Sequence, residues 1–511
     1  MTAPADLVLT NARVHTLTDP DETREAVAIR DGHIVRVDDE FEVDFLVGVE
    51  TDVVDCGGRV VLPGFVDAHT HMRELGQYQV HADLSQADSP DHATDILASD
   101  AHDDREWILG FGWDESGWDD DRYLTRDDLD EVSGERPVAA IRVDMHTATL
   151  NSVALSMLRD EMPDEDVQTD DGEPTGVVVE DAIEPVWDAI EPDPEETSEL
   201  LAAAQSFAVE RGVTGVHDMV RQSHAPRVYR EMAAAGDLDL RVRINYWSDH
   251  LGAVREAGLR TNHGCMKVET GAIKSFTDGS FGGRTAKLSE PYADDSEETG
   301  TWVVDPDELD DIAREADDAG FQLTVHAIGD EAITATLDAF EETGNPGESR
   351  HRVEHVELVT DEHIDRFADT GIIASCQPNF LQWAGEDGLY DHRLGSERRK
   401  QTNRYRDLLD AGVNLAFSSD VMPMGPLLGI HHAVNAPEPS QRLTVTEAIR
   451  AYTLGGAYAG FAEDRLGTIE AGKLGDLVVL DESPWENEDA IRDIDVAMTV
   501  VDGEVVYDAS V

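Results

Sequence analysis

The sequence has 511 residues, of which 40% are hydrophobic, enough to build large hydrophobic cores. Lysine and arginine total 39 against 109 aspartates and glutamates, so the formal net charge is −70. This charge excludes nucleic acid or an anionic membrane as the expected main partner, because both require a basic surface. No segment has the roughly 20 apolar residues of a membrane span, and the N-terminus does not resemble a secretory signal. The three cysteines cannot form a disulfide framework, and we expect a cytoplasmic protein.

The acidic residues are spread over the whole chain, and only five lysines are present. A dispersed acidic surface repels itself at low salt, whereas molar salt reduces the screening length to about 3 Å. We therefore hypothesise that the protein is halophilic and works in a salt-loaded cytoplasm. Ordinary acidity that serves solubility is the alternative.

Both ends of the sequence predict short strands. Residues 6–17 and 25–39 are rich in β-branched side chains, and the second segment contains the turn signal Asp31-Gly32. The last forty residues repeat this composition, with a second Asp-Gly pair at 502–503. We expect residues 1–59 and 464–511 to form one small composite β domain.

The middle of the sequence alternates short apolar runs with helical patterns such as 306–319 and 404–411, as βα units do. Eight strands are predicted, at 60–68, 213–219, 241–247, 268–276, 321–326, 352–356, 371–376 and 413–418. Eight such units indicate an α/β fold, a (β/α)8 TIM barrel formed by residues 60–75 and 196–463. The connection between the first two strands is too long for one crossover, so we expect residues 76–195 to be an insertion.

His69 and His71 follow the apolar run 60–66 at the end of the first predicted strand. Residues i and i+2 of a strand point to the same side, so the two imidazoles are expected to converge. Converging imidazoles are a common beginning of a site for zinc or a related divalent metal. Alone, this pattern also occurs in histidines that only support packing.

Other predicted strands end in residues of the same kind. His326, His355 and Asp420 each close an apolar run, at the end of a strand where barrel enzymes carry their catalytic residues. Packing alone does not explain four histidines and one aspartate in such positions. Lys274 lies within the apolar fourth strand, where a buried cation must be paired, neutralised or modified.

Eight segments carry a family resemblance. They are VLPGFVDAHTHM, GFGWDESGW, DMHTATLNSVAL, IKSFTDGSFGGRTA, VHAIGD, RVEHVEL, FSSD and GTIEAGKLGDLVVLD. Together they resemble the metal-dependent amidohydrolase superfamily, and specifically its amidohydrolase-3, YtcJ-like branch, which includes N-substituted formamide deformylase. The resemblance covers nearly the whole chain, but its motifs are poor guides to the substrate.

The resemblance implies a (β/α)8 barrel with a small β-sandwich built from both termini. It implies a divalent metal, with zinc the first candidate, held by His69, His71, His326, His355 and Asp420. Lys274 falls where several branches carry a carboxylated lysine that bridges two metals, so both one ion and two ions stay open. A homodimer is compatible with the family.

The expected activity is hydrolysis of an amide or N-formyl carbon–nitrogen bond, other than a peptide bond, in a small molecule. A divalent metal lowers the pKa of bound water towards about 7. Asp420 would take the proton of this water and later pass it to the leaving nitrogen. The alternatives are a cyclic-amide hydrolase, a deaminase or an esterase of the same superfamily, and a non-catalytic regulatory protein on the same scaffold.

Four residues are predicted to bind the substrate: Trp113, His146, Asp278 and Arg284. Trp113 belongs to the insertion, and its alternative role is to form the hydrophobic core of that insertion. His146 also belongs to the insertion, and its alternative place is the start of a helix. Arg284 lies in a glycine-rich loop after the fourth strand, where it would either bind a substrate carboxylate or hold the loop.

Overall fold

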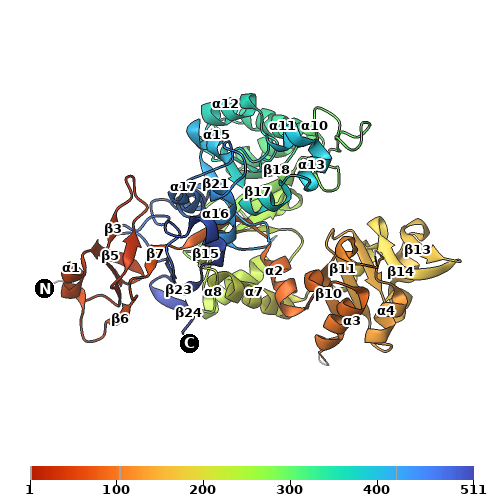
Figure 1. Cartoon of the computed structure of the whole chain (residues 1–511), viewed down its shortest axis with the longest axis horizontal. Coiled ribbons are helices and arrows are strands. Elements are labelled where there is room, and N and C mark those ends of the chain that lie inside the picture. The colour runs from red at the N-terminus through yellow and green to blue at the C-terminus, as the bar shows by residue number, and fades with distance from the viewer. Residues whose placement is uncertain (1–2, 103–104, 121, 422, 511) are drawn as a thin grey trace. The chain divides into compact units, whose positions relative to one another are not determined.

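The structure is a computed structural model that describes residues 3–102, 105–120, 122–421 and 423–510 (Figure 1). The chain divides into two compact units. The first comprises Met1–His71 and Gln205–Val511, and the second comprises Met72–Ala204. Among the described residues, no helix is both long and apolar enough to cross a lipid bilayer.

The first unit contains a sheet of eight parallel strands in the order β21-β20-β19-β18-β17-β16-β15-β8. These strands are β8 (Phe65–Thr70), β15 (Val213–Val220), β16 (Arg241–Trp247), β17 (Val268–Phe276), β18 (Leu323–Ala327), β19 (Arg352–His355), β20 (Ile373–Cys376) and β21 (Leu415–Phe417). Nearly all their residues are buried, as expected for parallel strands that are covered on both faces. The predicted (β/α)8 barrel is confirmed.

A helix lies between each pair of successive barrel strands. These helices are α7 (Pro194–Val209), α8 (Ala225–Ala235), α9 (Leu251–Glu256), α10 (Pro306–Asp318), α11 (Asp330–Glu341), α12 (Asp361–Thr370) and α15 (Tyr405–Asp410). Several begin with side-chain caps, such as Thr360 before α12, whose hydroxyl accepts from the N–H of His363. The chain continues through α16 (Pro426–Val434), α17 (Val445–Arg450) and α18 (Gly456–Ala459).

The expected single strand over residues 60–68 is wrong. The segment forms two strands, β7 (Val60–Pro63) and β8, which belong to different sheets. Gly64 separates them, and a Cβ at this position would lie 2.2 Å from Cγ2 of Thr214. The close approach requires glycine there, and Pro63 cannot donate a ladder hydrogen bond, so the chain leaves one sheet and enters the barrel.

Two further sheets of this unit contain strands from the chain ends. A four-stranded sheet has the order β5-β4-β1-β6, and a six-stranded sheet has the order β24-β23-β22-β7-β2-β3. The strands are β1 (Leu7–Thr10), β2 (Arg13–His15), β3 (Thr23–Arg24), β4 (Ala26–Arg30), β5 (His33–Asp38), β6 (Asp52–Asp55), β22 (Leu477–Leu480), β23 (Val496–Val501) and β24 (Glu504–Asp508). β22 pairs with β7, so both ends of the chain meet in one sheet.

Apolar residues of both sheets form one hydrophobic cluster. It includes Leu9 and Val27 of the four-stranded sheet and Val61, Val479 and Val500 of the six-stranded sheet. This packing confirms the small β-sandwich built from both termini.

The Asp-Gly turns join neighbouring strands as predicted. Asp31 and Gly32 have φ values of 50° and 73°, and Asp502 and Gly503 have 58° and 80°, the left-handed backbone that a two-residue type I′ hairpin requires.

The second unit has its own six-stranded sheet, in the order β13-β14-β12-β11-β10-β9. The strands are β9 (Ala82–Asp83), β10 (Ile108–Trp113), β11 (Val138–Arg142), β12 (Thr147–Leu150), β13 (Val167–Asp170) and β14 (Glu173–Val179). The helices are α2 (Met72–Val80), α3 (Pro90–Ser99), α4 (Arg126–Val132), α5 (Ser152–Leu158) and α6 (Glu184–Ala189). The second unit lies between β8 and β15 in the sequence, where the insertion was expected.

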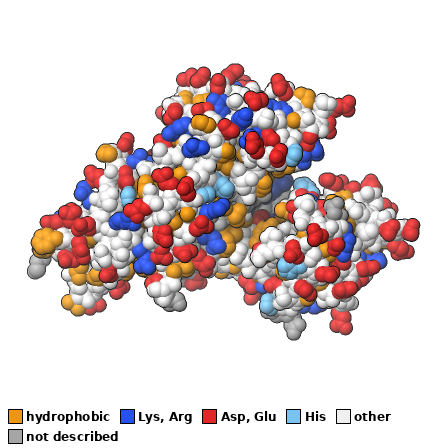
Figure 2. All heavy atoms as spheres, viewed as in Figure 1, with side chains coloured by type: hydrophobic (Ala, Val, Ile, Leu, Met, Phe, Trp, Pro, Cys, Tyr) orange, Lys and Arg blue, Asp and Glu red, His pale blue; other side chains and the backbone are white. Residues whose placement is uncertain are grey.

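Acidic side chains are spread over the face of the molecule shown in Figure 2, with lysine and arginine scattered among them. On this face the surface is therefore predominantly acidic. Each unit also has its own cluster of buried apolar side chains.

Candidate metal centre

The candidate metal ligands His69, His71 and Asp420 belong to the two edge strands of the barrel sheet or follow them. His69 lies in β8, and His71 follows that strand directly. Asp420 follows β21, the strand at the opposite edge of the sheet. The N–H of Asp420 donates to the carbonyl oxygen of His69 at 2.9 Å. This hydrogen bond brings the ends of the first and last barrel strands together and places the three side chains in one space.

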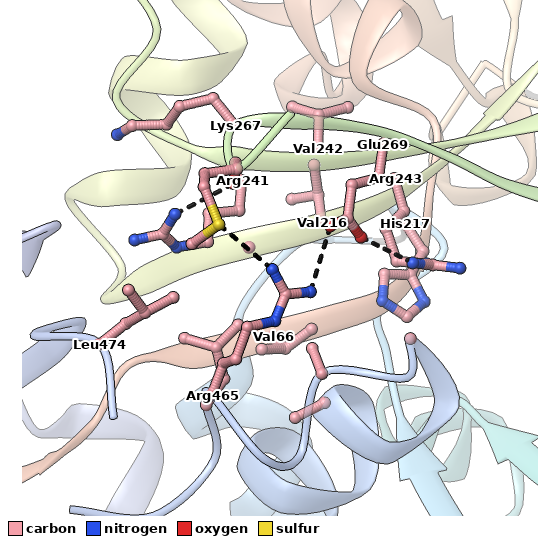
Figure 3. Close-up of a pocket in the computed structure, with 16 residues that line it drawn as sticks. Val66, Val216, His217, Arg241, Val242, Arg243, Lys267, Glu269, Arg465 and Leu474 are labelled. Atoms are coloured by element: carbon pink, nitrogen blue, oxygen red, sulfur yellow. Dashed lines mark hydrogen bonds and ion pairs between the residues drawn. The ribbon is translucent and has the colours of Figure 1, made fainter. Parts of the chain in front are cut away.

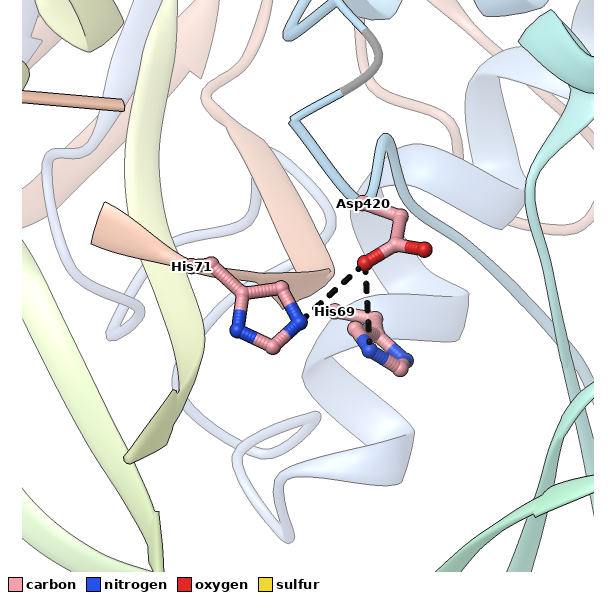
Figure 4. Close-up of side chains that lie close together, drawn as sticks. All are labelled: His69, His71 and Asp420. Carbon is pink, nitrogen blue, oxygen red and sulfur yellow. Dashed lines mark ion pairs between the residues drawn. The ribbon is translucent and has the colours of Figure 1, made fainter. Parts of the chain in front are cut away.

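His69, His71 and Asp420 form a compact set of donor atoms (Figure 4). Nε2 of His71 lies 3.2 Å and Nε2 of His69 lies 3.5 Å from Oδ1 of Asp420. The three donor atoms lie within 4.8 Å of one another. Two imidazole nitrogens and a carboxylate oxygen are the donor types that zinc and related divalent metals take in proteins. These residues therefore fit a metal ion.

The charge state of Asp420 suits this role. Burial alone would raise the pKa of its carboxyl group, but attraction to His69 and the contact with His71 lower it below the usual range. The group is therefore ionised near neutral pH, which is the form that binds a metal and accepts a proton.

His326 and His355 lie next to this set. The ring centroids of His326 and His355 are 4.3 Å apart, and those of His69 and His355 are 5.1 Å apart. Burial lowers the pKa of His326 to about 3 and that of His355 well below its usual value. Both imidazoles are therefore neutral at physiological pH, as metal binding requires. Nδ1 of His355 is buried and has no hydrogen-bond partner among the described residues, as expected of an atom that awaits a ligand.

The backbone is strained at two of the candidate ligands. His355 has a φ of 74° and Asp420 has a φ of 56°, and the β-branched residues after them, Val356 and Val421, have 52° and 66°. Positive φ is rare for such residues. Strain of this kind is tolerated where the surrounding structure holds it, and it concentrates at functional sites.

Lys274 lies inside the barrel sheet, where β17 delivers it. Its side chain is 1% exposed, and Nζ lies 4.7 Å from the centroid of the Phe276 ring. No carboxylate of the described residues forms an ion pair with it. Burial lowers the pKa of Lys274 to about 8. The ion pair that we considered as an alternative is therefore absent among the described residues.

Asp278 stabilises the loops next to the candidate ligand His326. Its buried carboxylate accepts hydrogen bonds from the N–H groups of Lys287, Ile328 and Gly329 at 2.7–3.0 Å. Nε2 of His326 lies 3.5 Å from the same carboxylate. Asp278 thus ties the loop after β17 to the loop after β18, and direct contact with a substrate stays a prediction.

Arg284 forms a two-pronged ion pair with Asp294, at 3.1 and 2.8 Å. Asp294 also pairs with Arg393, so Arg284 holds its own loop in this structure. Its predicted contact with a substrate carboxylate stays a prediction and would require the Asp294 pair to open.

The two predicted substrate residues of the insertion differ in exposure. Trp113 is fully buried in the core of the second unit, and its Nε1 donates to the carbonyl oxygen of Ala140 at 3.1 Å. A substrate would reach this ring only after a change of structure. His146 is exposed and lines a cavity of about 440 Å³ within the second unit, together with Gln77 and Trp187. The substrate role of both residues stays a prediction.

Glu354 is a functional neighbour to which our sequence analysis assigned no role. Its buried Oε2 lies 2.7 Å from Nδ1 of His69. Histidines that bind metals usually make such a contact with their second nitrogen, which fixes the tautomer and the ring orientation. The sequence signal was available, because Glu354 is an acidic residue within the predicted barrel strand 352–356, where a buried charge must find a partner.

Comparison with known proteins identifies the family of this chain. The sequence pattern described as the amidohydrolase family matches residues 52–507. The chain belongs to the amidohydrolase family. This amidohydrolase is 33% identical to a putative amidohydrolase, YtcJ, from Bacillus subtilis, over 97% of this chain and 98% of the relative. It is 27% identical to the N-substituted formamide deformylase of Arthrobacter pascens, over 99% of both chains.

A solved structure is similar to this amidohydrolase over nearly its whole length. It is an uncharacterised metal-dependent hydrolase from Pyrococcus furiosus, with a TM-score of 0.82 and 30% identity. The alignment covers 94% of this chain and 99% of that chain. These findings confirm the predicted family and support the predicted enzyme class, a metal-dependent amidohydrolase that acts on carbon–nitrogen bonds other than peptide bonds.

Proposed function

We propose that this amidohydrolase hydrolyses an amide or N-formyl bond of a small molecule, with a divalent metal held at His69, His71 and Asp420. The observation that carries the proposal is the convergence of Nε2 of His69 and Nε2 of His71 on Oδ1 of Asp420. His326 and His355 would complete the expected ligand set, because the neutral ring of His355 adjoins His69 and the neutral ring of His326 adjoins His355. Zinc is our first candidate, since it prefers nitrogen and carboxylate ligands.

When bound, a divalent metal supplies a water of lowered pKa and polarises the carbonyl group of the substrate. Asp420 is ionised and partly exposed, so its carboxylate accepts the proton of the attacking water. The same carboxyl group then donates this proton to the leaving nitrogen. His71 lies next to Asp420 and helps to hold the carboxylate in place.

Lys274 bears on the number of metal ions. A neutral amine reacts with carbon dioxide to form a carbamate and releases one proton, and the lowered pKa of Lys274 increases the share of neutral amine near neutral pH. The product would be an anionic ligand, which removes the cost of a buried cation without an ion pair. We propose that Lys274 is carboxylated and that the site holds two ions.

A substrate panel tests the proposed function. The purified protein would be stripped with a chelator, reloaded with zinc and offered formamides, N-acyl amines and cyclic amides while amine release is measured. We expect turnover of at least one linear amide class with zinc and none after chelation. A protein that binds no metal and leaves every compound intact would support the regulatory alternative.

A further inference from the structure

Glu354 links the candidate metal ligand His69 to a buried arginine. Oε2 of Glu354 lies 2.7 Å from Nδ1 of His69, and Nε of Arg352 donates to Oε1 of Glu354 at 2.6 Å. Arg352 and Glu354 are residues i and i+2 of β19, so their side chains point to the same side of the strand. Both side chains are inaccessible to solvent, at 1% and 0% exposure.

The guanidinium of Arg352 makes hydrogen bonds through all three of its nitrogens. Nη1 lies 2.8 Å from Nδ1 of His217, and Nη2 contacts the carbonyl oxygen of Ala68 and Oγ of Ser375. Its partners come from four barrel strands, β8, β15, β19 and β20. These contacts hold the arginine against Glu354, because each of the three guanidinium nitrogens has at least one defined acceptor.

His217 ends this chain of hydrogen bonds. A guanidinium only donates, so Nδ1 of His217 must accept, and its ring must be neutral. His217 is 3% exposed and lines a cavity of about 40 Å³ that also contains Val66, Val242 and the cationic Arg243 (Figure 3). Burial and the positive charges of Arg352 and Arg243 keep the ring uncharged, because they lower its pKa well below the usual value.

The charges of Arg352 and Glu354 determine which atom of His69 carries the proton. The carboxylate of Glu354 accepts from the fixed guanidinium of Arg352 at 2.6 Å, so its negative charge has a buried cationic partner. The Glu354 carboxylate can accept a hydrogen bond from Nδ1–H of His69, which leaves the lone pair of Nε2, 3.5 Å from Asp420, available to the proposed metal. Without Arg352, Glu354 would be a buried, uncompensated carboxylate, and its hold on His69 would weaken.

We propose that Arg352 and His217 are positioning residues, which set the tautomer and orientation of the metal ligand His69 through Glu354. The inference rests on the proposed function, because it requires His69 to hold the metal. It extends the site from the mouth of the barrel to side chains inside the sheet that touch neither metal nor substrate.

Zinc affinity tests this inference independently of activity. The full-length protein and its Arg352→Lys and Arg352→Met variants would be titrated with zinc against a chromophoric chelator. We expect zinc affinity to fall by about 10–100-fold in both variants, as for other residues that orient a metal ligand. Lysine keeps the charge but cannot reach Glu354 and His217 together, so charge alone should not restore binding.

Arg243→Lys is the matched control. Arg243 is also a buried barrel arginine that lines the same cavity, and it pairs with Glu269 and Asn262 at 2.9 Å. Its hydrogen bonds do not lead to a metal ligand among the described residues. We expect this variant to bind zinc as the wild type does, and an equal loss in it would overturn the proposal by showing a general effect of altered packing.

A second pair of variants changes His217, the last residue in this series of hydrogen bonds. These variants test the proposal even if the Arg352 variants fail to fold. His217→Leu removes the acceptor for Arg352, whereas His217→Asn retains an oxygen that can accept. We expect weaker zinc binding for His217→Leu and near-normal binding for His217→Asn. Wild-type affinity in His217→Leu overturns the positioning role.

The same titration separates the two proposals. If His69→Ala binds zinc as tightly as the wild type, the proposed metal site is wrong, and the inference falls with it. If His69→Ala loses zinc while Arg352→Met and His217→Leu keep it, the metal site stands and only the positioning role is overturned.

Discussion

The backbone N–H of Asp420 donates to the carbonyl oxygen of His69 at 2.9 Å, which joins the end of the last barrel strand to the first. The side chains of these two residues therefore face each other because the barrel closes. The contact places the Asp420 carboxylate beside two candidate metal ligands, His69 and His71, where the proposed reaction requires a proton acceptor.

Replacing Asp420 by asparagine should remove nearly all turnover. The amide cannot accept a proton, and general acid–base groups of this kind contribute about 10²–10⁴-fold to the rate. We expect kcat to fall by at least this factor while the circular dichroism spectrum and the melting temperature stay close to the wild type. Zinc content measured on the same sample separates loss of the proton acceptor from loss of the metal. Near-normal turnover would refute the role of Asp420.

Lys274 should determine the number of bound metal ions. We expect two zinc ions per wild-type chain and at most one in Lys274→Ala, because the variant lacks the proposed carbamate. Metal analysis after gel filtration measures this ratio, and a carbon-13 signal after growth in labelled bicarbonate identifies the carbamate. One ion per chain in both proteins would contradict the two-ion proposal.

Stability should depend on salt. Self-repulsion of the acidic surface, at a net charge of −70, is screened as the salt concentration rises to the molar range. We expect the melting temperature to rise steadily with potassium chloride, and a neutral osmolyte at equal osmolarity to have a smaller effect. Full stability and activity in dilute buffer without divalent ions would refute the halophilic hypothesis.

Glu357 should make stability fall as pH rises. Burial raises the pKa of Glu357 to about 8, and its carboxyl group contacts Oη of Tyr390. Because the folded-state pKa is above the unfolded one, the contribution to stability is complete below pH 4.5 and is lost as pH rises through about 8. Glu357→Gln mimics the neutral form.

The free energy of unfolding of wild type and Glu357→Gln should therefore diverge between pH 5 and about 8, in favour of the variant. The expected slope is on the order of 1.4 kcal/mol per pH unit, measured by urea denaturation of the metal-free proteins. A difference that stays constant with pH would show that Glu357 does not titrate in this range.

Trp113→Ala should destabilise the second unit rather than change substrate affinity alone. The ring is fully buried and packs near Trp118 and Tyr123, and removal of such a ring costs about 3–5 kcal/mol. Limited proteolysis should show faster cleavage within residues 72–204. An intact second unit with a raised KM would instead support the substrate role predicted from the sequence.

Much of the fold was predictable because its signals are local. The hairpin at Asp31 and Gly32 follows from the residue types that accept positive φ, and the barrel strands follow from apolar runs of strand length. The break at Gly64 was missed because apolar residues continue on both sides of it. Only the approach of Thr214, from a strand far along the chain, shows why a glycine stands there.

The amino-acid sequence by itself determined which side chains could bind a metal and at which end of each strand they lie, because alternation along a strand is set by neighbouring residues. The tertiary structure decided which of them meet. Closure of the barrel places His69 beside Asp420, and burial pairs its other nitrogen with Glu354. Such partners depend on how distant strands are ordered in the sheet, and a buried charge takes the partner that this order brings within reach.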